Sequence, residues 1–367
     1  MINDIPRRSK TLLLQSAVIL PLIASGVAHA APEIATVDGT LAAGSTLTIE
    51  GTGFGSKSRP QPALWDTTDN QADVYSSVSN GAPIPTGQNY PFTSTNQDVY
   101  LERGTNDRSR YDGDSMRYVT RGNGALSNPT ALGGNSPPTD IREIYVRYWS
   151  RFERTPLDSG SNASHKFMRV WTGSGDDLRI SWTQKQLTVN NRNAGGTSAK
   201  TVWEDWTGDP NAWNLHEFWI NADRGLIVAS VNGDEYIRFQ DSDSRYLARN
   251  HPTGLRIAQI GWNPSHGTSS IANQTQWISD IYIDTTPARV LISDQPRWSS
   301  VTHSEILIPS SWSDSEISVD FEPKSLSETP NEDLYLYVVN PDGVANSRGY
   351  ALSCPSCPSA PGSLQAN

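Results

Sequence analysis

The sequence has 367 residues, with 39 acidic and 29 basic side chains and a formal net charge of −10. A chain of this length has room for two domains with ordinary hydrophobic cores. The acidic balance excludes a general nucleic-acid-binding protein, which needs a basic surface. It also gives no overall attraction to an anionic polysaccharide, although a local basic cleft remains compatible with such a ligand.

The first thirty residues have the pattern of a secretory signal peptide. Three basic residues precede a mostly apolar stretch over 12–27, and Ala28-His29-Ala30 forms a small-residue cleavage site. We therefore expect residues 1–30 to be removed and the mature protein to be secreted or periplasmic, without insertion into a membrane.

Most of the chain that follows shows the alternation of polar and apolar residues that is typical of half-buried β-strands. Gly, Asn and Asp separate these stretches, and no long helical period occurs. The strands expected before residue 288 cover 99–103, 115–120, 142–152, 165–171, 178–182, 217–232, 255–262 and 276–284. This pattern predicts an all-β fold.

The two ends of the chain resemble parts of a single domain. Pro32-Glu33-Ile34-Ala35 and the stretch over 44–55 resemble the opening of an IPT/TIG domain, an immunoglobulin-like β-sandwich. The strands over 288–339 and the hairpin sequence Asn340-Pro341-Asp342-Gly343 resemble its end. We expect 31–56 and 288–353 to form one discontinuous domain with 57–287 inserted into a loop, a place where insertions are tolerated.

The inserted region resembles the concanavalin A-like lectin/glucanase jelly roll. The strand over 144–152, the hairpin that ends in Val231-Asn232-Gly233 and the closing strand over 276–284 carry this resemblance. It implies a jelly-roll β-sandwich with a polysaccharide as partner. It does not imply one activity, because the fold supports lectins, hydrolases, lyases and adhesion modules.

Alternation also assigns side chains to strand faces. Aromatic rings stack on sugars, and Arg or His side chains bind hydroxyl and carboxylate groups. On two neighbouring strands such residues recur at every second position, so we predict that one face of the jelly roll, the concave one, carries a glycan groove. Its expected lining is Tyr145, Arg147, Trp149, Arg151, His165, Arg169 and Trp171. The alternative is a convex face whose aromatic residues pack under loops.

Three functions are compatible with this groove. The first is polysaccharide recognition without cleavage. The second is a lyase that cleaves a uronate-containing glycan, with His165 and Tyr145 exchanging protons and Arg169 neutralising the uronate. The third is a non-catalytic adhesion module. A glycosidase is disfavoured because the Glu-x-Asp-x-x-Glu motif of laminarinases is absent from the sequence.

Other motifs indicate structure rather than chemistry. Gln259-Ile260-Gly261 resembles the Gln-Ile-His of alginate-lyase-like jelly rolls, with Gly in place of His. Cys354 and Cys357 predict a small disulfide, and 354–367 a disordered tail. We expect no cofactor; paired aspartates near residues 112, 176 and 241 leave calcium possible, but none forms a complete calcium loop. Trp203-Glu204-Asp205-Trp206 is interpreted as a packed loop.

Overall fold

The computed structural model describes residues 30–96, 99–104, 115–121, 124–136, 140–157, 165–172, 178–191, 198–240, 254–264 and 274–353. The predicted signal peptide, apart from Ala30, lies outside these residues. So do the predicted disulfide between Cys354 and Cys357, the predicted disordered tail and the aspartate pairs considered for calcium.

The described chain consists of antiparallel β-strands joined by turns and by isolated 3-10 turns, which confirms the prediction of an all-β fold built from sandwiches. No helix in the described ranges is long and apolar enough to cross a membrane. The expected strands are present, and the structure adds strands that alternation did not reveal. These are β3 (Leu64–Asp66), β4 (Phe92–Asn96), β7 (Ala125–Pro129), β11 (Gln186–Asn191), β12 (Ser198–Trp203) and β15 (Asp234–Gln240).

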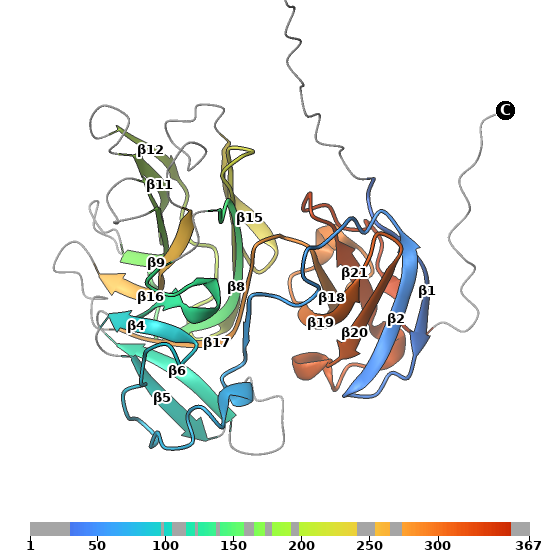
Figure 1. The fold of residues 1–367 in the computed structure, drawn as a ribbon, viewed down its shortest axis with the longest axis horizontal. Helices are drawn as coiled ribbons and strands as arrows, with labels where there is room; N and C mark the ends of the chain where they lie inside the picture. Colours follow the sequence, from blue (N-terminus) through green and yellow to red (C-terminus); the bar gives the residue numbers. More distant parts are fainter. Residues whose placement is uncertain are drawn as a thin grey trace, which may run out of the picture.

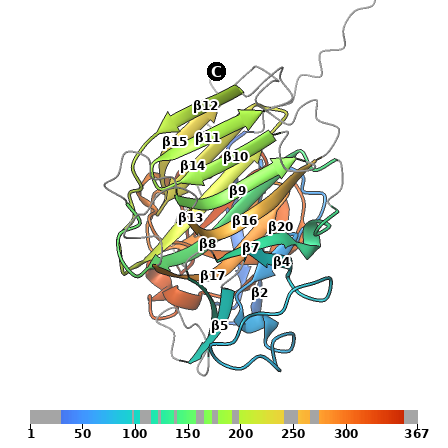
Figure 2. The same cartoon turned by 90° about the vertical axis from the view of Figure 1, so that its left-hand side faces the viewer.

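Two sheets, one of eight strands and one of seven, form the larger sandwich, which lies on the left of Figure 1. Sheet I contains, in spatial order, β15, β14 (Leu226–Val231), β13 (Trp213–Asn221), β8 (Glu143–Phe152), β17 (Thr275–Asp284), β6 (Ser115–Arg121) and β5 (Val99–Gly104), and β3 pairs with β17. Sheet II contains β12, β11, β10 (Leu178–Thr183), β9 (His165–Thr172), β16 (Leu255–Pro264), β7 and β4. In Figure 2 the strands of sheet II face the viewer.

An aromatic core fills the space between sheets I and II. Its largest fully buried side chains include Trp182, Trp262, Phe152 and Phe167. Interior positions recur at every second residue along the strands, as the pleat of a sheet requires. The core therefore leaves sheet II with one face turned inward and one face turned away from the protein.

His216 lies at the centre of this core. Its ring stacks on Tyr148 at a centroid distance of 5.3 Å, and its Nε2 accepts a hydrogen bond from the Trp206 indole at 3.0 Å. Burial lowers the pKa of His216 to about 3, although the Asn214 carbonyl that faces Nδ1 acts in the opposite direction. His216 is thus a neutral core residue.

We expect this buried imidazole to make the fold sensitive to acid. In the unfolded chain a histidine has a pKa near 6.5, so the unfolded state binds a proton below that pH. The folded state does not protonate His216 until the pH reaches about 3. Stability should therefore fall as the pH is lowered through this window. Urea unfolding at neutral pH and at about pH 4 would measure the loss. A smaller loss is expected in His216→Phe, and an unchanged loss would contradict the assignment.

Strands from both ends of the chain form a third sheet. Sheet III has the order β1 (Glu33–Gly39), β2 (Ser45–Thr52), β20 (Glu316–Phe321), β19 (Glu305–Trp312), β18 (Arg289–Ser293), β21 (Tyr335–Val339) and β22 (Tyr350–Ala351). β2 pairs with β20 from Ser45↔Phe321 to Glu50↔Glu316. β19 pairs first with β18 and then with β20, so the sheet folds around a separate core. The division into an IPT/TIG-like domain and an insert remains a prediction.

Sheet III packs on the outer face of sheet I. Tyr145 and Tyr282 of sheet I lie in one buried cluster with Leu291, Ile306 and Tyr337 of sheet III. Two turn glycines allow close approach here. A Cβ on Gly233 would lie 2.0 Å from the Val301 carbonyl oxygen, and a Cβ on Gly343 would lie 2.7 Å from the Trp219 ring. Each hairpin turn that carried a family resemblance therefore contacts the other sandwich. Gly233 of the larger sandwich approaches Val301, and Gly343 approaches Trp219 of sheet I.

Gly233→Ala should destabilise this junction. Gly233 has φ +80, where an alanine is strained, and its added methyl group would also strike a backbone oxygen. We expect a loss of about 2 to 4 kcal/mol in the free energy of unfolding, the sum of backbone strain and overpacking. Gly81→Ala is the matched control, because Gly81 has φ +75 and open space around its Cβ position. Equal losses in the two variants would contradict the close contact.

Candidate functional site

The predicted faces of β8 are correct, but the outer face is not open. Ile144, Val146 and Tyr148 point into the core, and the odd-numbered residues point outward. The Arg147 guanidinium donates to the carbonyl and the hydroxyl of Ser304, and Trp149 lies edge-on to His303 at 5.3 Å. Sheet III thus covers the part of β8 that was predicted to bind a glycan, which corrects that prediction for Tyr145, Arg147 and Trp149.

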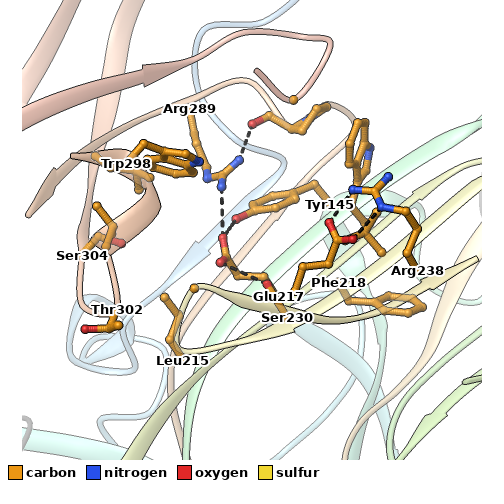
Figure 3. Close-up of a pocket in the computed structure, with 18 residues that line it drawn as sticks. Tyr145, Leu215, Glu217, Phe218, Ser230, Arg238, Arg289, Trp298, Thr302 and Ser304 are labelled. Carbon is orange, nitrogen blue, oxygen red and sulfur yellow. Dashed lines mark hydrogen bonds and ion pairs between the residues drawn. The ribbon is translucent and has the colours of Figure 1, made fainter. Parts of the chain in front are cut away.

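A small cavity of about 260 Å³ remains at this junction (Figure 3). The guanidinium of Arg289 lies 3.1 Å from the Glu217 carboxylate, to which the Tyr145 hydroxyl also donates. Burial would raise the pKa of Glu217, but Arg289 and Arg147 outweigh it and lower the pKa. The carboxylate is therefore charged and paired, so these groups join sheet I to sheet III.

The remaining predicted residues do not share one face. His165 is fully buried, and its ring stacks on the core residue Trp262 at 4.8 Å. The reason is a bulge in β9, where Met168 pairs with Trp182 but Lys166 pairs with the next residue, Thr183. One extra residue reverses the alternation, so the prediction that His165 faces outward with Arg169 is wrong.

The proposed lyase pair is consequently not assembled. His165 points from sheet II into the core, whereas Tyr145 points from sheet I toward sheet III. The resemblance at Gly261 leads to the same conclusion. Gly261 has φ +132, and a Cβ there would lie 2.9 Å from the Gly124 carbonyl oxygen, so a histidine does not fit. The Gln259 amide donates to the backbone of Lys166 and of Gly261.

Arg151, the last of the predicted groove residues on β8, lies apart from the others. Its guanidinium stands over the rings of Trp213 and Trp277, at 5.7 and 4.4 Å. Those two residues belong to the neighbouring strands β13 and β17, so Arg151 packs on aromatic surface of sheet I.

Arg169 and Trp171 do face outward, and they belong to a cationic cluster on sheet II. The register pairs Trp171 with Arg179 on β10 and with Arg256 on β16. An arginine therefore flanks the indole on each side, and Arg169 stands two residues before it on the same strand. Each of the three guanidinium carbons lies 5.5 Å from the centre of the Trp171 ring. We use "cationic cluster" for Lys166, Arg169, Trp171, Arg179 and Arg256.

The indole reduces the cost of gathering these charges, because a guanidinium is attracted to the face of an aromatic ring. Repulsion remains. Burial lowers the pKa of Lys166 to about 7, with Arg169 and Arg179 adding to the shift. Burial and Arg179 lower the pKa of Arg169 to about 10, and burial lowers that of Arg256. The site is therefore one in which a further negative charge would be stabilised.

Sheet II offers no carboxylate of its own to the cluster. None of its seven strands contains Asp or Glu, although the whole chain has 39. Arg169 donates to the Ser181 hydroxyl at 3.2 Å, and no salt bridge of Arg169 or Arg256 occurs within the described ranges. The Trp171 indole N–H and the Arg256 Nε have no acceptor there either. Buried donors without an acceptor are uncommon in folded proteins.

Uncharged polar groups continue the outer face on both sides of the cluster. The register places Asn190 beside Arg179 and Thr188 beside Ser181, because cross-strand partners share a face. On the other side the Ser127 hydroxyl of β7 donates to the Ala258 carbonyl. The face thus combines a charged centre with flanking hydroxyl and amide groups.

The sequence-based interpretation missed one residue of this face. Trp203, assigned to a packed loop, ends β12 and pairs with Gln186 of β11. Its side chain is 63% exposed, whereas Trp206 of the same motif is buried. The face of β12 that carries Trp203 also carries Ala199 and Thr201, so alternation gave no clear signal of its exposure.

The arrangement can hold an anionic group, and the described residues do not suggest a metal centre. Within those residues no group of three or more His, Cys, Asp or Glu side chains converges to hold a metal ion. The cationic cluster supplies bidentate donors, which suit carboxylate and sulfate oxygens.

Comparisons with known proteins place no family on this chain. No protein-family model matches the sequence, and no curated protein sequence is similar to it. Among solved structures it is similar to the cellulose-induced protein Cip1, with 20% identity over 52% of this chain and 88% of that chain and a TM-score of 0.34. The receptor-binding domain of botulinum neurotoxin mosaic serotype C/D has 13% identity over 61% and 47%, with a TM-score of 0.33. The binding domain of botulinum neurotoxin serotype G has 10% identity over 52% of this chain and 42% of that chain, with a TM-score of 0.32. The chain thus spans less than half of each neurotoxin domain.

Proposed function

We propose that this protein is exported and binds an acidic polysaccharide on the outer face of sheet II. The observation that carries the proposal is the cationic cluster, in which three arginines surround Trp171 on a sheet without Asp or Glu. In a chain of net charge −10, a site where neither Arg169 nor Arg256 has a carboxylate partner among the described residues suits an anionic ligand.

A polysaccharide suits this face better than a nucleic acid. Nucleic-acid binding depends on many phosphate contacts and on a broadly basic surface, whereas the chain has a net charge of −10 and, among the described residues of this face, the arginines gather around Trp171. Beyond them the face carries uncharged amide side chains, such as that of Asn190, which match sugar hydroxyls. Trp171 itself is half-buried between guanidinium groups, so it positions the arginines.

The runner-up function is cleavage of the same ligand. Lys166 favours it, because its pKa of about 7 leaves a neutral amine beside arginines that would neutralise a uronate carboxylate. In a lyase the Lys166 amine would take the proton from C5 while the C4–C5 double bond forms. The C4–O bond would break, and the leaving oxygen would take a proton from solvent.

One experiment separates these functions. The purified mature protein is mixed with uronate, sulfated and neutral polysaccharides, while retention in an affinity gel and the ultraviolet absorbance of unsaturated uronate are recorded. Retention by acidic polymers with flat absorbance would support binding alone. A rise in absorbance that is lost in Lys166→Met would establish the lyase. Retention only by neutral polymers, or by none, would sink the proposal.

Affinity should also depend on pH. Lys166 is protonated below its pKa of about 7 and neutral above it, so an anionic ligand gains a favourable charge only at the lower pH. Binding measured calorimetrically should weaken about tenfold between slightly acidic and alkaline pH, which corresponds to a ligand-induced rise of one pKa unit. In Lys166→Met this dependence should disappear; a similar dependence in the variant would assign it to another group.

A further inference from the structure

Trp203 stands exposed on the same face as the cationic cluster. It pairs with Gln186 of β11, and the sheet continues through Thr183 to Lys166 of β9. Cross-strand partners share a face, so Trp203 and the cluster lie on the same side of sheet II, with Thr183 and Lys166 buried between them. Its exposed fraction is 63%, the highest of the large apolar side chains in the described ranges. The other two exposed large apolar side chains there are Val74 and Val344.

An exposed apolar residue by itself is ordinary, but the surroundings of this one differ from those of Trp171. Trp171 is covered by guanidinium groups on its ring faces. The Trp203 side chain has no hydrogen bond and no ring contact with any residue that the structure describes. Its ring faces are therefore available to stack on the apolar face of a sugar ring.

The separation between the two tryptophans calls for an extended ligand. β12 and β9 are three strands apart in the sheet, a distance of about 14 Å at the usual spacing of neighbouring strands. The register aligns Trp171 with Ala199, four residues before Trp203, which adds about 13 Å along the strands and gives about 19 Å in all. A single sugar ring cannot reach both, whereas several linked rings that cross the strands can. The same polysaccharide chain would then occupy both places.

The charge near Trp203 differs in sign from that of the cluster. Glu204 and Asp205 follow it directly, and both are exposed. An acidic sugar stacked on Trp203 would face these carboxylates, whereas an uncharged sugar would not. The face is thus cationic at β9, β10 and β16 and acidic at the end of β12.

From this pattern we infer that Trp203 is a platform for an uncharged sugar ring. The ligand is then a mixed polysaccharide that carries both acidic and uncharged sugars, rather than a polymer of uronate alone. This inference rests on the proposed function, because it names the substrate class of the same face.

The test compares two oligosaccharides of equal length, one made only of uronate and one in which uronate alternates with an uncharged hexose. Wild-type protein should bind the alternating chain more tightly. Trp203→Ala should weaken binding of the alternating chain about tenfold and leave binding of the uronate chain unchanged, since one aromatic contact is lost. Trp203→Phe should retain most of the affinity, and Val74→Ala is the control for loss of exposed apolar surface.

The outcomes distinguish failure of this inference from failure of the proposed function, binding of an acidic polysaccharide, on which it rests. Equal loss on both chains, or no loss on either, would overturn the platform while leaving acidic polysaccharide binding in place. Absence of binding to both chains by the wild-type protein would overturn the proposed function, and the platform with it.

Discussion

Replacing both Arg169 and Arg256 by glutamine should lower the affinity for an acidic polysaccharide by about a hundredfold or more. Each of these arginines can make charge-assisted hydrogen bonds worth about 1.5 to 3 kcal/mol, and a tenfold change in affinity corresponds to about 1.4 kcal/mol. These two positions are the informative ones because no carboxylate pairs with either within the described ranges. Glutamine keeps a polar side chain but removes the charge.

The stability of this variant is part of the result. Arg169 and Arg256 are half-buried among like charges, and burial lowers the pKa of both. Loss of the two charges should therefore leave the melting temperature unchanged or raise it, as expected where function opposes stability.

The matched control is Arg142→Gln with Arg238→Gln. These arginines pair with Asp223 and Glu235 at sheet I and change the net charge by the same amount. Calorimetry at two salt concentrations gives the affinity, and the wild-type value should fall with salt. A double variant of Arg169 and Arg256 that binds like the control would refute the cationic cluster as the site.

Replacing Glu217 by alanine should destabilise the protein by about 3 to 5 kcal/mol, the usual cost of breaking a buried ion pair. The change leaves Arg289, which is 7% exposed, and Arg147, which is 2% exposed, without the carboxylate that offsets their charges. It also removes the acceptor of the Tyr145 hydroxyl. Urea unfolding followed by tryptophan fluorescence measures the loss.

A second variant tests the cause. Glu217→Leu combined with Arg289→Met removes both charges of the pair, so it should recover much of the stability that either single change loses. Polysaccharide binding by the refolded variants should stay unchanged, because the pair lies at the junction of sheets I and III. A loss below about 1 kcal/mol in Glu217→Ala would show that the pair is only a surface contact.

Alternation of side chains predicted the strands well and the binding site poorly. On β8 the period of two held throughout, so the inward position of Tyr148 and the outward position of Arg147 followed from sequence. On β9 the same reasoning was right for Arg169 and Trp171 but failed for His165 and Lys166, because the bulge between the two pairs depends on how the neighbouring strands pair. The residues of β9 alone do not determine that pairing.

Burial by a distant segment was the other source of error. Tyr145 and Trp149 are aromatic residues on an outward face, a pattern equally typical of a glycan groove and of a packed interface. Only the position of Ser304 and His303, more than 150 residues later, distinguishes the two. Trp203 is the reverse case, since its neighbours in sequence suggested packing and the edge of sheet II left it exposed.

The sequence alone determined that the protein is all-β and where many of its strands lie, because these follow from local composition and from the period of two. The tertiary structure decided which side chains of those strands meet. Arg169, Arg179 and Arg256 come from three separate strands, and only sheet pairing brings them to one indole. The absence of acidic residues from sheet II likewise becomes visible only when the order of the strands is known.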